Sequence, residues 1–272
     1  MTTHPIGIFD SGIGGLTVLK EIRRQIPGEN LIYFGDEARF PYGIKSAGTV
    51  RRFSGEVAEY LMRQGIKMLV VACNTATAAA LNSLREDLPI PVIGVLMPGA
   101  YAAARATKTG RVGVIGTEGT ISSGVYSKLI KNIRPGTEIS ALPCPLFVPL
   151  VEEGRLSGEI ASLVAKEYLA PLKGRKIDTL VLGCTHYPLL KPVIGSVMGP
   201  SVTLIDSADE TAREVKRVLT KNGLLNPGGE KKSRSLPTGF IRYCVTDAPE
   251  RFKTIGERFL GYDIPEVEKA EL

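Results

Sequence analysis

Short apolar runs rich in Val and Ile recur along the chain, separated by longer stretches in which apolar residues have helical spacing. The runs are continuous rather than alternating, which is typical of parallel strands buried on both faces. The predicted strands are Ile6–Ser11, Leu31–Phe34, Met68–Val71, Val92–Val95, Val112–Ile115, Thr179–Leu182, Val202–Ile205 and Phe240–Thr246.

Helices are predicted between these strands. From Leu16 to Ile26 the apolar residues fall on one helical face, and Pro27-Gly28 ends the segment. The other predicted helices are Thr49–Gln64, Ala76–Asp87, Ala208–Asn222 and Pro249–Leu260, and Asn226–Ser235 is predicted to be a surface loop. Strands that alternate with helices indicate an α/β fold with right-handed crossovers.

The two halves of the chain share a pattern. Ile6–Ser11 runs into the Gly-rich turn Gly12–Gly15, and Val112–Thr117 runs into the turn Glu118–Thr120. This similarity indicates an internal repeat of an α/β unit. The alternative is that the two halves share only the strand-turn-helix order that is common to all α/β domains.

We therefore expect two similar, open, mostly parallel α/β sheet domains related by pseudo-symmetry, with the active site in the cleft between them. The first domain is predicted to comprise residues 1–97 plus 208–272, and the second residues 98–207. The boundaries are placed at Met97-Pro98-Gly99 and after Asp206-Ser207.

Cys73 and Cys184 occupy matched positions in these halves, each directly after an apolar run. Each thiol is therefore expected at the carboxyl end of a strand, where open α/β sheets present groups to ligands. Two thiols that meet across a cleft can act on opposite faces of one carbon atom, which is the geometry that inverts a stereocentre. The alternative is that each cysteine is a small buried hydrophobe, but their matched placement favours chemistry.

Both cysteines are also expected at helix N-termini, where the macrodipole favours the thiolate. Asn74 or Thr75 would cap the helix after Cys73, and Pro188 suits a first helical turn after Cys184. Cys144, flanked by prolines, and Cys244, within a predicted strand, lack such settings and are interpreted as packing residues.

Three further features can support chemistry. His186 lies two residues after Cys184 and can act as an acid or base or help to ionise the thiol. Asp10 ends a very apolar strand, so it either handles protons near the first thiol or hydrogen-bonds the following loop. The loop Ser11–Gly15 offers backbone amides that suit a carboxylate or a phosphate, but it lacks a full dinucleotide fingerprint.

Composition narrows the function. The formal net charge of +6, partly in the runs Lys128–Arg134 and Lys231–Arg234, can steer an acidic small-molecule substrate. Basic residues are not interleaved with aromatic ones, and Trp is absent, so no nucleic-acid partner is expected.

Other classes are also disfavoured. No apolar run is long enough to span a membrane, no signal peptide is visible, and four cysteines without a Cys-x-x-Cys pair suggest a reducing cytoplasm. A Cys-x-His pair alone is a weak metal motif, and no lysine stands in a pyridoxal-phosphate context, so neither a metal nor a cofactor is expected.

Four motifs, in the same order along the chain, closely resemble those of bacterial glutamate racemases. They are FDSGIGG at Phe9–Gly15, RFPYG at Arg39–Gly43, VACNTAT at Val71–Thr77 and LGCTHYPLL at Leu182–Leu190. The resemblance runs from about Ile6 to about Leu260 and shows no departure inside these motifs. It implies cofactor-independent interconversion of L- and D-glutamate.

The same resemblance implies roles for individual residues. Cys73 and Cys184 would be the two acid/base residues, with Cys184 taking the proton from L-glutamate and Cys73 from D-glutamate, and Asp10, His186 and Glu152 would assist them. The residues that match substrate-binding positions are Asp10, Ser11, Pro41, Tyr42, Gly43, Asn74, Thr75, Thr117, Thr120, Thr185 and His186. The resemblance also implies a homodimer and a supply of D-glutamate for peptidoglycan, with a capsule polymer as the alternative use.

Two alternatives stay open at this point. Aspartate racemases also have paired cysteines, although the Pro41–Gly43 and Gly183–His186 motifs favour glutamate. A non-catalytic protein that binds an amino acid or an anion could have the same fold, but intact cysteines in both halves argue against it.

Overall fold

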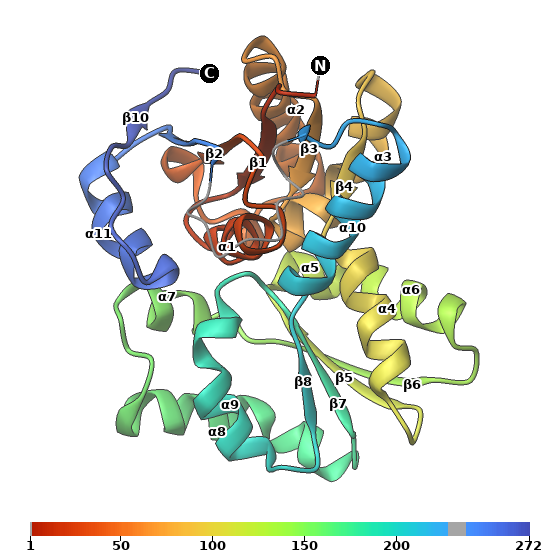
Figure 1. Ribbon diagram of the computed structural model, residues 1–272. Helices are drawn as coiled ribbons and strands as arrows, with labels where there is room; N and C mark the ends of the chain where they lie inside the picture. Colours follow the sequence, from red (N-terminus) through yellow and green to blue (C-terminus); the bar gives the residue numbers. More distant parts are fainter. Residues whose placement is uncertain (1, 228–237) are drawn as a thin grey trace. The chain divides into compact units, whose positions relative to one another are not determined.

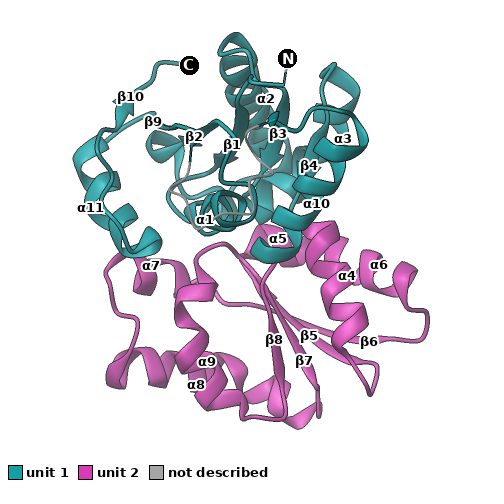
Figure 2. Cartoon of the chain, in the orientation of Figure 1, with its two compact units in different colours: residues 1–95, 208–272 teal, residues 96–207 magenta. Residues whose placement is uncertain are grey.

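The structure is a computed structural model that describes residues 2–227 and 238–272. The chain divides into two compact units, Met1–Val95 with Ala208–Leu272 and Leu96–Ser207, shown in two colours in Figure 2. Each unit contains one open sheet in which every strand pair is parallel, which confirms the predicted fold class.

Unit 1 has a six-stranded sheet with β1 and β3 near one end of the order β10-β9-β2-β1-β3-β4 (Figure 1). β1 pairs with both β2 and β3, and all of its residues are buried. The strands are β1 Ile6–Asp10, β2 Leu31–Gly35, β3 Met68–Val71, β4 Val92–Gly94, β9 Ile241–Val245 and β10 Glu268–Lys269.

The helices of unit 1 form two layers. α1 packs against α10 and α11, while α2 and α3 pack together over the apolar side chains of β1, β2 and β3. Their bounds are α1 Leu16–Gln25, α2 Ala47–Arg63, α3 Asn74–Asp87, α10 Ala208–Lys221 and α11 Pro249–Leu260, with 3₁₀ turns η1 Glu37–Arg39 and η2 Tyr42–Ile44.

Unit 2 has a four-stranded sheet in the order β6-β5-β7-β8. α4 packs against α6 and β7, and α8 packs against α9. The strands are β5 Arg111–Gly116, β6 Glu138–Pro143, β7 Thr179–Gly183 and β8 Thr203–Ile205. The helices are α4 Leu96–Ala106, α5 Glu118–Ser122, α6 Val125–Ile133, α7 Phe147–Glu152, α8 Gly158–Gly174, η3 Tyr187–Leu190 and α9 Lys191–Met198.

The strands at the sheet edges differ most from the prediction. β6 and β10 were missed, because β6 alternates weakly and β10 is only two residues long. β8 was predicted to be buried on both faces, but Thr203 is exposed, since β8 has a neighbouring strand on one side only. Continuous apolar runs therefore identified the central strands better than the edges.

Two predictions concern segments between the strands and helices. Met97-Pro98-Gly99, predicted as a domain crossing, lies in the first turn of α4, where a proline costs no intrahelical hydrogen bond. The predicted loop Asn226–Ser235 lies outside the described residues beyond Pro227, as does the basic run Lys231–Arg234.

Within residues 2–227 and 238–272, no helix has the length and apolar character needed to cross a membrane.

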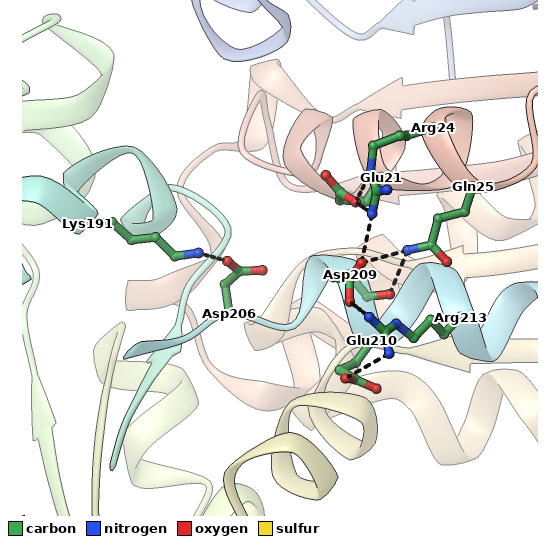
Figure 3. A network of polar contacts seen from close by, with 8 residues as sticks. All are labelled: Glu21, Arg24, Gln25, Lys191, Asp206, Asp209, Glu210 and Arg213. Carbon is green, nitrogen blue, oxygen red and sulfur yellow. Dashed lines mark hydrogen bonds and ion pairs between the residues drawn. The ribbon is translucent and has the colours of Figure 1, made fainter. Parts of the chain in front are cut away.

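Polar contacts hold α10 against α1 in unit 1. Asp209 accepts hydrogen bonds from Arg24 and Gln25, both at 2.9 Å, and forms an ion pair with Arg213 at 2.7 Å (Figure 3). In unit 2, Lys191 forms an ion pair with Asp206 (Figure 3). Arg24 and Arg213 are largely exposed, so solvent screening keeps their contribution to stability small.

A second ion pair in unit 1 is buried. Lys67 precedes β3 and Glu29 precedes β2, and their side chains are 2% and 0% exposed with Nζ and Oε2 2.6 Å apart. Lys67 also donates to the carbonyl of Leu224 at 2.8 Å, and the amide of Asn226 donates to Glu29 at 2.7 Å. The pair therefore ties the segment after α10 to the amino ends of the central strands.

We expect Lys67→Met to lower the free energy of unfolding by roughly 3–5 kcal/mol, because it leaves the Glu29 carboxylate buried without its cation. Arg24→Met, which removes an exposed ion pair, should cost only about 0–1 kcal/mol. Urea unfolding followed by circular dichroism measures both. Equal losses in the two variants would contradict a stabilising role for the buried pair.

Candidate active site

In unit 1 the predicted site residues Asp10 and Cys73, together with Asp36, lie at the carboxyl ends of three adjacent strands. Asp10 is the last residue of β1, Asp36 directly follows β2, and Cys73 lies two residues after β3. The amide of Ala72 donates to the carbonyl of Phe9 at 2.8 Å, so the pairing of β1 and β3 extends almost to Cys73. Parallel pairing thus brings these residues to one edge of the sheet.

The Gly-rich turn after β1 is held close to Asp10. The carboxylate of Asp10 accepts a hydrogen bond from the amide of Gly12 at 3.1 Å, and the buried hydroxyl of Tyr33 donates to the carbonyl of Gly12 at 2.7 Å. A Cβ atom at Gly15 would lie 2.7 Å from the Cβ atom of Asp10, so a side chain there has no room. Asp10 therefore has the loop-bonding role, one of its two predicted roles, and its part in proton transfer stays a prediction.

Cys73 is itself the N-cap of α3. Its backbone is extended, and its Sγ atom accepts a hydrogen bond from the amide of Ala76 at 3.4 Å. The prediction that Asn74 or Thr75 caps this helix was wrong, because both lie in its first turn, where they are buried. The thiol also lies 3.7 Å from the hydroxyl of Ser11.

The surroundings of Cys73 oppose ionisation. Burial and, next, the nearby carboxylate of Asp10 raise the pKa of the thiol to about 12, against the weaker opposite effect of hydrogen bonds from Ala76 and Ser11. The amide of Ala76 at the helix N-terminus does favour the thiolate, as expected, but burial and Asp10 outweigh it. Cys73 is a neutral thiol at neutral pH and can donate a proton.

The predicted substrate loop lies in the same unit. Tyr42 is fully buried, and its hydroxyl donates to the carboxylate of Asp36. Burial and the charge of Asp36 raise the pKa of Tyr42, so its hydroxyl keeps its proton. Pro41 is half-buried and Gly43 is buried, and the 3₁₀ turn that begins at Tyr42 leaves its first amides without acceptors inside the turn. The hydroxyl of Tyr42 is therefore bonded inside the unit, and the backbone of this turn is the candidate for a substrate contact.

In unit 2 two strands end side by side. Gly116 of β5 pairs with Gly183 of β7, and Thr117 and Cys184 follow them. A Cβ atom on Gly183 would lie 2.7 Å from the carbonyl oxygen of Ile115, which requires glycine there. This close approach brings the turn after β5 and the thiol after β7 to the same edge of the sheet.

Thr117 and Thr120 form the turn after β5. The hydroxyl of Thr117 accepts a hydrogen bond from the amide of Thr120 at 3.3 Å and donates to the hydroxyl of Thr120 at 3.0 Å. Thr117 thereby caps α5. Thr120 is buried and Thr117 half-buried, and Thr185 is buried beside Cys184 in the chain.

Cys184 heads a line of three ionisable side chains. Its Sγ atom lies 3.9 Å from Nδ1 of His186, and Nε2 of His186 lies 3.3 Å from Oε1 of Glu152, the last residue of α7. All three side chains are buried. With the Nε2 proton donated to Glu152, Nδ1 is left to accept the proton of the thiol, as in other enzymes that activate a cysteine with a histidine.

Cys184 does not lie at an α-helix N-terminus, and that prediction was wrong. The chain forms a turn in which the amide of Tyr187 donates to the carbonyl of Cys184 at 3.2 Å, continues as η3, and begins α9 only at Lys191. Pro188 lies in η3 rather than in an α-helix. The group beside the thiol is therefore an imidazole and not a helix dipole.

The other two cysteines have different surroundings. Cys144 directly follows β6, its amide donates to the carbonyl of Gly116 at 2.9 Å, and its carbonyl accepts from the hydroxyl of Tyr187 at 2.7 Å. Cys144 is fully buried, and burial raises the pKa of its thiol to about 12. Cys244 is a fully buried residue of β9 whose Sγ atom is 3.9 Å from a carboxylate oxygen of Glu268. All four cysteines are free thiols. Residues 2–227 and 238–272 contain no group of three or more His, Cys, Asp or Glu side chains arranged to hold a metal ion.

Sequence reasoning missed Asp36. It is fully buried and bonded to Arg39, Tyr42 and Thr246. Its position directly after an apolar run is the signal that drew attention to Cys73 and Asp10, and the same signal could have identified it.

Known proteins share this sequence and this fold. The sequence profile of the family described as Asp/Glu/Hydantoin racemase matches residues 6–215. A glutamate racemase of Geobacter metallireducens is 55% identical over 272 residues, which are 100% of this chain and 98% of the relative.

Two solved structures extend the comparison. Glutamate racemase isoform RacE1 from Bacillus anthracis has a TM-score of 0.94 at 43% identity, with coverage of 100% of this chain and 99% of that one. Glutamate racemase from Francisella tularensis in complex with D-glutamate has a TM-score of 0.90 at 39% identity, with coverage of 100% and 98%. The chain therefore belongs to the Asp/Glu/Hydantoin racemase family of isomerases, which confirms the family that its motifs predicted.

Proposed function

We propose that this protein interconverts L- and D-glutamate without a cofactor, with Cys73 and Cys184 as acid and base on opposite faces of the α-carbon. The observation that carries the proposal is that each unit has a buried thiol just beyond a strand that pairs on both sides, Cys73 after β3 and Cys184 after β7, with its own polar partners. Ser11 and Asp10 surround Cys73, and His186 with Glu152 accompanies Cys184. The glutamate racemases that resemble the chain over its whole length support glutamate as the substrate.

The different surroundings of the two thiols support the direction of proton transfer that the resemblance implies. For L-glutamate, Cys184 gives its proton to Nδ1 of His186, and the thiolate takes the α-proton while Glu152 stabilises the imidazolium. Cys73, whose pKa is raised, is already protonated and delivers its proton to the other face of the carbanion. D-glutamate reacts in the reverse order.

The reverse direction requires Cys73 to ionise beside Asp10. The ammonium group of a bound amino acid supplies a positive charge that favours the thiolate and offsets the carboxylate of Asp10. The two carboxylates of glutamate would be held by hydroxyl and amide groups. The candidates are Ser11, Asn74, Thr75, Thr117, Thr120 and Thr185, with the backbone amides of Tyr42 and Gly43 in the loop Pro41–Gly43. We also propose a cytoplasmic homodimer that supplies D-glutamate for peptidoglycan.

We expect Cys73→Ala and Cys184→Ala each to lower racemisation in both directions by at least about 10²–10⁴-fold, since every turnover uses both proton-transfer groups. Circular dichroism of L- and D-glutamate, without added cofactor, follows the reaction, and the aspartate enantiomers in the same assay test substrate choice. Cys244→Ala, which removes a buried thiol within β9, is the matched control and should keep its rate. Near-wild-type turnover by either of the first two variants would defeat the mechanism.

We expect His186→Asn and Asp10→Asn each to lower kcat by at most about 10²–10⁴-fold, as removal of acid–base assistance does, and to raise KM by a smaller factor. Because enantiomers have equal free energy, kcat/KM must fall equally in both directions, so the affected step must be found by isotope effects. For α-deuterated L-glutamate the primary isotope effect should grow in His186→Asn, and for α-deuterated D-glutamate it should grow in Asp10→Asn. Isotope effects that respond in the opposite pattern would reverse the assignment of the two thiols.

The raised pKa of Cys73 predicts its reactivity in the protein without substrate. Only the thiolate is alkylated, so the rate of iodoacetamide attack on Cys73 should still rise about tenfold per pH unit between about pH 8 and pH 10, below a pKa of about 12. Asp10→Asn should lower that pKa, because it removes the negative charge. Mass spectrometry of the Cys73 peptide measures the rate, and a plateau below pH 9 in the wild-type protein would show that the thiol ionises normally.

A further inference from the structure

Asp36 is a buried carboxylate at the carboxyl edge of the sheet in unit 1. It directly follows β2, and its side chain is completely inaccessible to solvent. Its amide donates to the carbonyl of Asp10 at 3.1 Å, which continues the pairing of β1 and β2 to the end of β1. A buried charge of this kind is costly unless hydrogen bonds and opposite charge compensate it.

Both carboxylate oxygens of Asp36 are used. Oδ2 accepts hydrogen bonds from the hydroxyl of Tyr42 and from Nε of Arg39, the latter at 2.6 Å, and Oδ1 accepts from the hydroxyl of Thr246 at 3.0 Å. These partners come from η2, from η1 and from the segment after β9. Asp36 therefore connects three segments that are far apart in the sequence.

Each partner is fixed again by contacts of its own. Arg39 forms an ion pair with Glu56 of α2, and its guanidinium lies 4.2 Å from the ring centroid of Phe53. The amide of Thr246 donates to the carbonyl of Gly35 at 3.1 Å, and its hydroxyl accepts from the amide of Ala38 at 2.9 Å. The cluster has little freedom to rearrange without breaking several charge-assisted hydrogen bonds.

Tyr42 is the link from this cluster to the proposed site. Its ring packs on Phe53 with centroids 5.7 Å apart, and it belongs to the same apolar cluster as Cys73, Phe9 and Val71. The predicted substrate loop Pro41–Gly43 is continuous with this ring. The hydroxyl bond to Asp36 therefore holds the ring that belongs to that loop and shares an apolar cluster with Cys73.

We propose that Asp36 is a positioning residue for the racemase site, acting through the hydroxyl of Tyr42 to hold the backbone of Pro41–Gly43 beside Cys73 in the geometry that receives a substrate carboxylate. This inference rests on the proposed function. Asp36 itself does not touch the reacting atoms in this scheme, and the C-terminal segment contributes through Thr246.

The test compares Asp36→Asn, Tyr42→Phe and the double variant in the racemase assay. Asparagine keeps the size of the side chain but loses the charge that accepts from Arg39 and Tyr42. Both single variants should raise KM at least about tenfold, as loss of a charge-assisted hydrogen bond does, and should lower kcat less. Because the two residues act through one bond, the double variant should be no worse than Asp36→Asn alone.

Lys67→Met is the control for a purely structural effect. It destabilises the same unit from the amino ends of the strands and should leave KM unchanged. The inference fails if Asp36→Asn keeps the wild-type KM, or if Lys67→Met raises KM as much. Should Asp36→Asn not fold, Thr246→Val replaces it in the test. Thr246→Val should raise KM, whereas Thr246→Ser, which keeps the hydroxyl, should have the wild-type KM. Equal KM values in these two variants would overturn the inference.

A second readout does not depend on the reaction. Loss of the Asp36–Tyr42 bond should loosen the wall beside Cys73 and speed its alkylation by iodoacetamide at least about tenfold relative to wild type and to Lys67→Met, if the bond contributes as charge-assisted bonds do. If the wild-type protein does not racemise glutamate, the proposed function fails, and the alkylation rates still decide the role of Asp36. Unchanged alkylation in Asp36→Asn and Tyr42→Phe would then overturn it.

Discussion

Parallel strand pairing is the constraint on which the rest of each unit depends. β1 pairs in register with β2 and β3, and β5 pairs with β6 and β7, so all their carboxyl ends point to one edge of each sheet. The residues directly after the strands then lie together, although they are separated along the chain. Glycines at Gly116 and Gly183 let the ends of β5 and β7 approach closely enough to set Thr117 beside Cys184.

The two thiols have different surroundings. Cys73 caps α3 and receives an amide hydrogen bond, but its burial and the carboxylate of Asp10 outweigh that bond and keep it protonated. Cys184 has no α-helix at its position and instead has an imidazole, backed by a buried carboxylate, within reach of its sulfur. In the proposed mechanism, the protonated Cys73 serves as the acid and the histidine-paired Cys184 as the base for L-glutamate, and the roles are exchanged for D-glutamate.

Buried charges in unit 1 are concentrated at both ends of its sheet. Glu29 and Lys67 neutralise each other at the amino ends of β2 and β3, whereas Asp36 is neutralised by Arg39 at the carboxyl end of β2. The first pair bonds to backbone groups after α10 and serves the fold, while Asp36 bonds to Tyr42 of the predicted substrate loop. Position along the strand thus separates a charge that stabilises the fold from one that, in our proposal, positions the substrate loop.

The sequence by itself determined the central strands, the parallel α/β class and the family, because continuous apolar runs and four motifs are local properties of the chain. It also placed Asp10, Cys73 and Cys184 at the carboxyl ends of their strands, since that position depends on chain order alone. Only the tertiary structure decided which group faces each thiol: that Cys73 caps its own helix, that His186 rather than a helix dipole stands beside Cys184, and that Tyr42 turns its hydroxyl to Asp36. The tertiary structure also decided the pKa of Cys73. Burial and the nearby Asp10 raise this pKa, and both arise from packing between strands and helices that are remote in sequence, so no local sequence pattern could predict it.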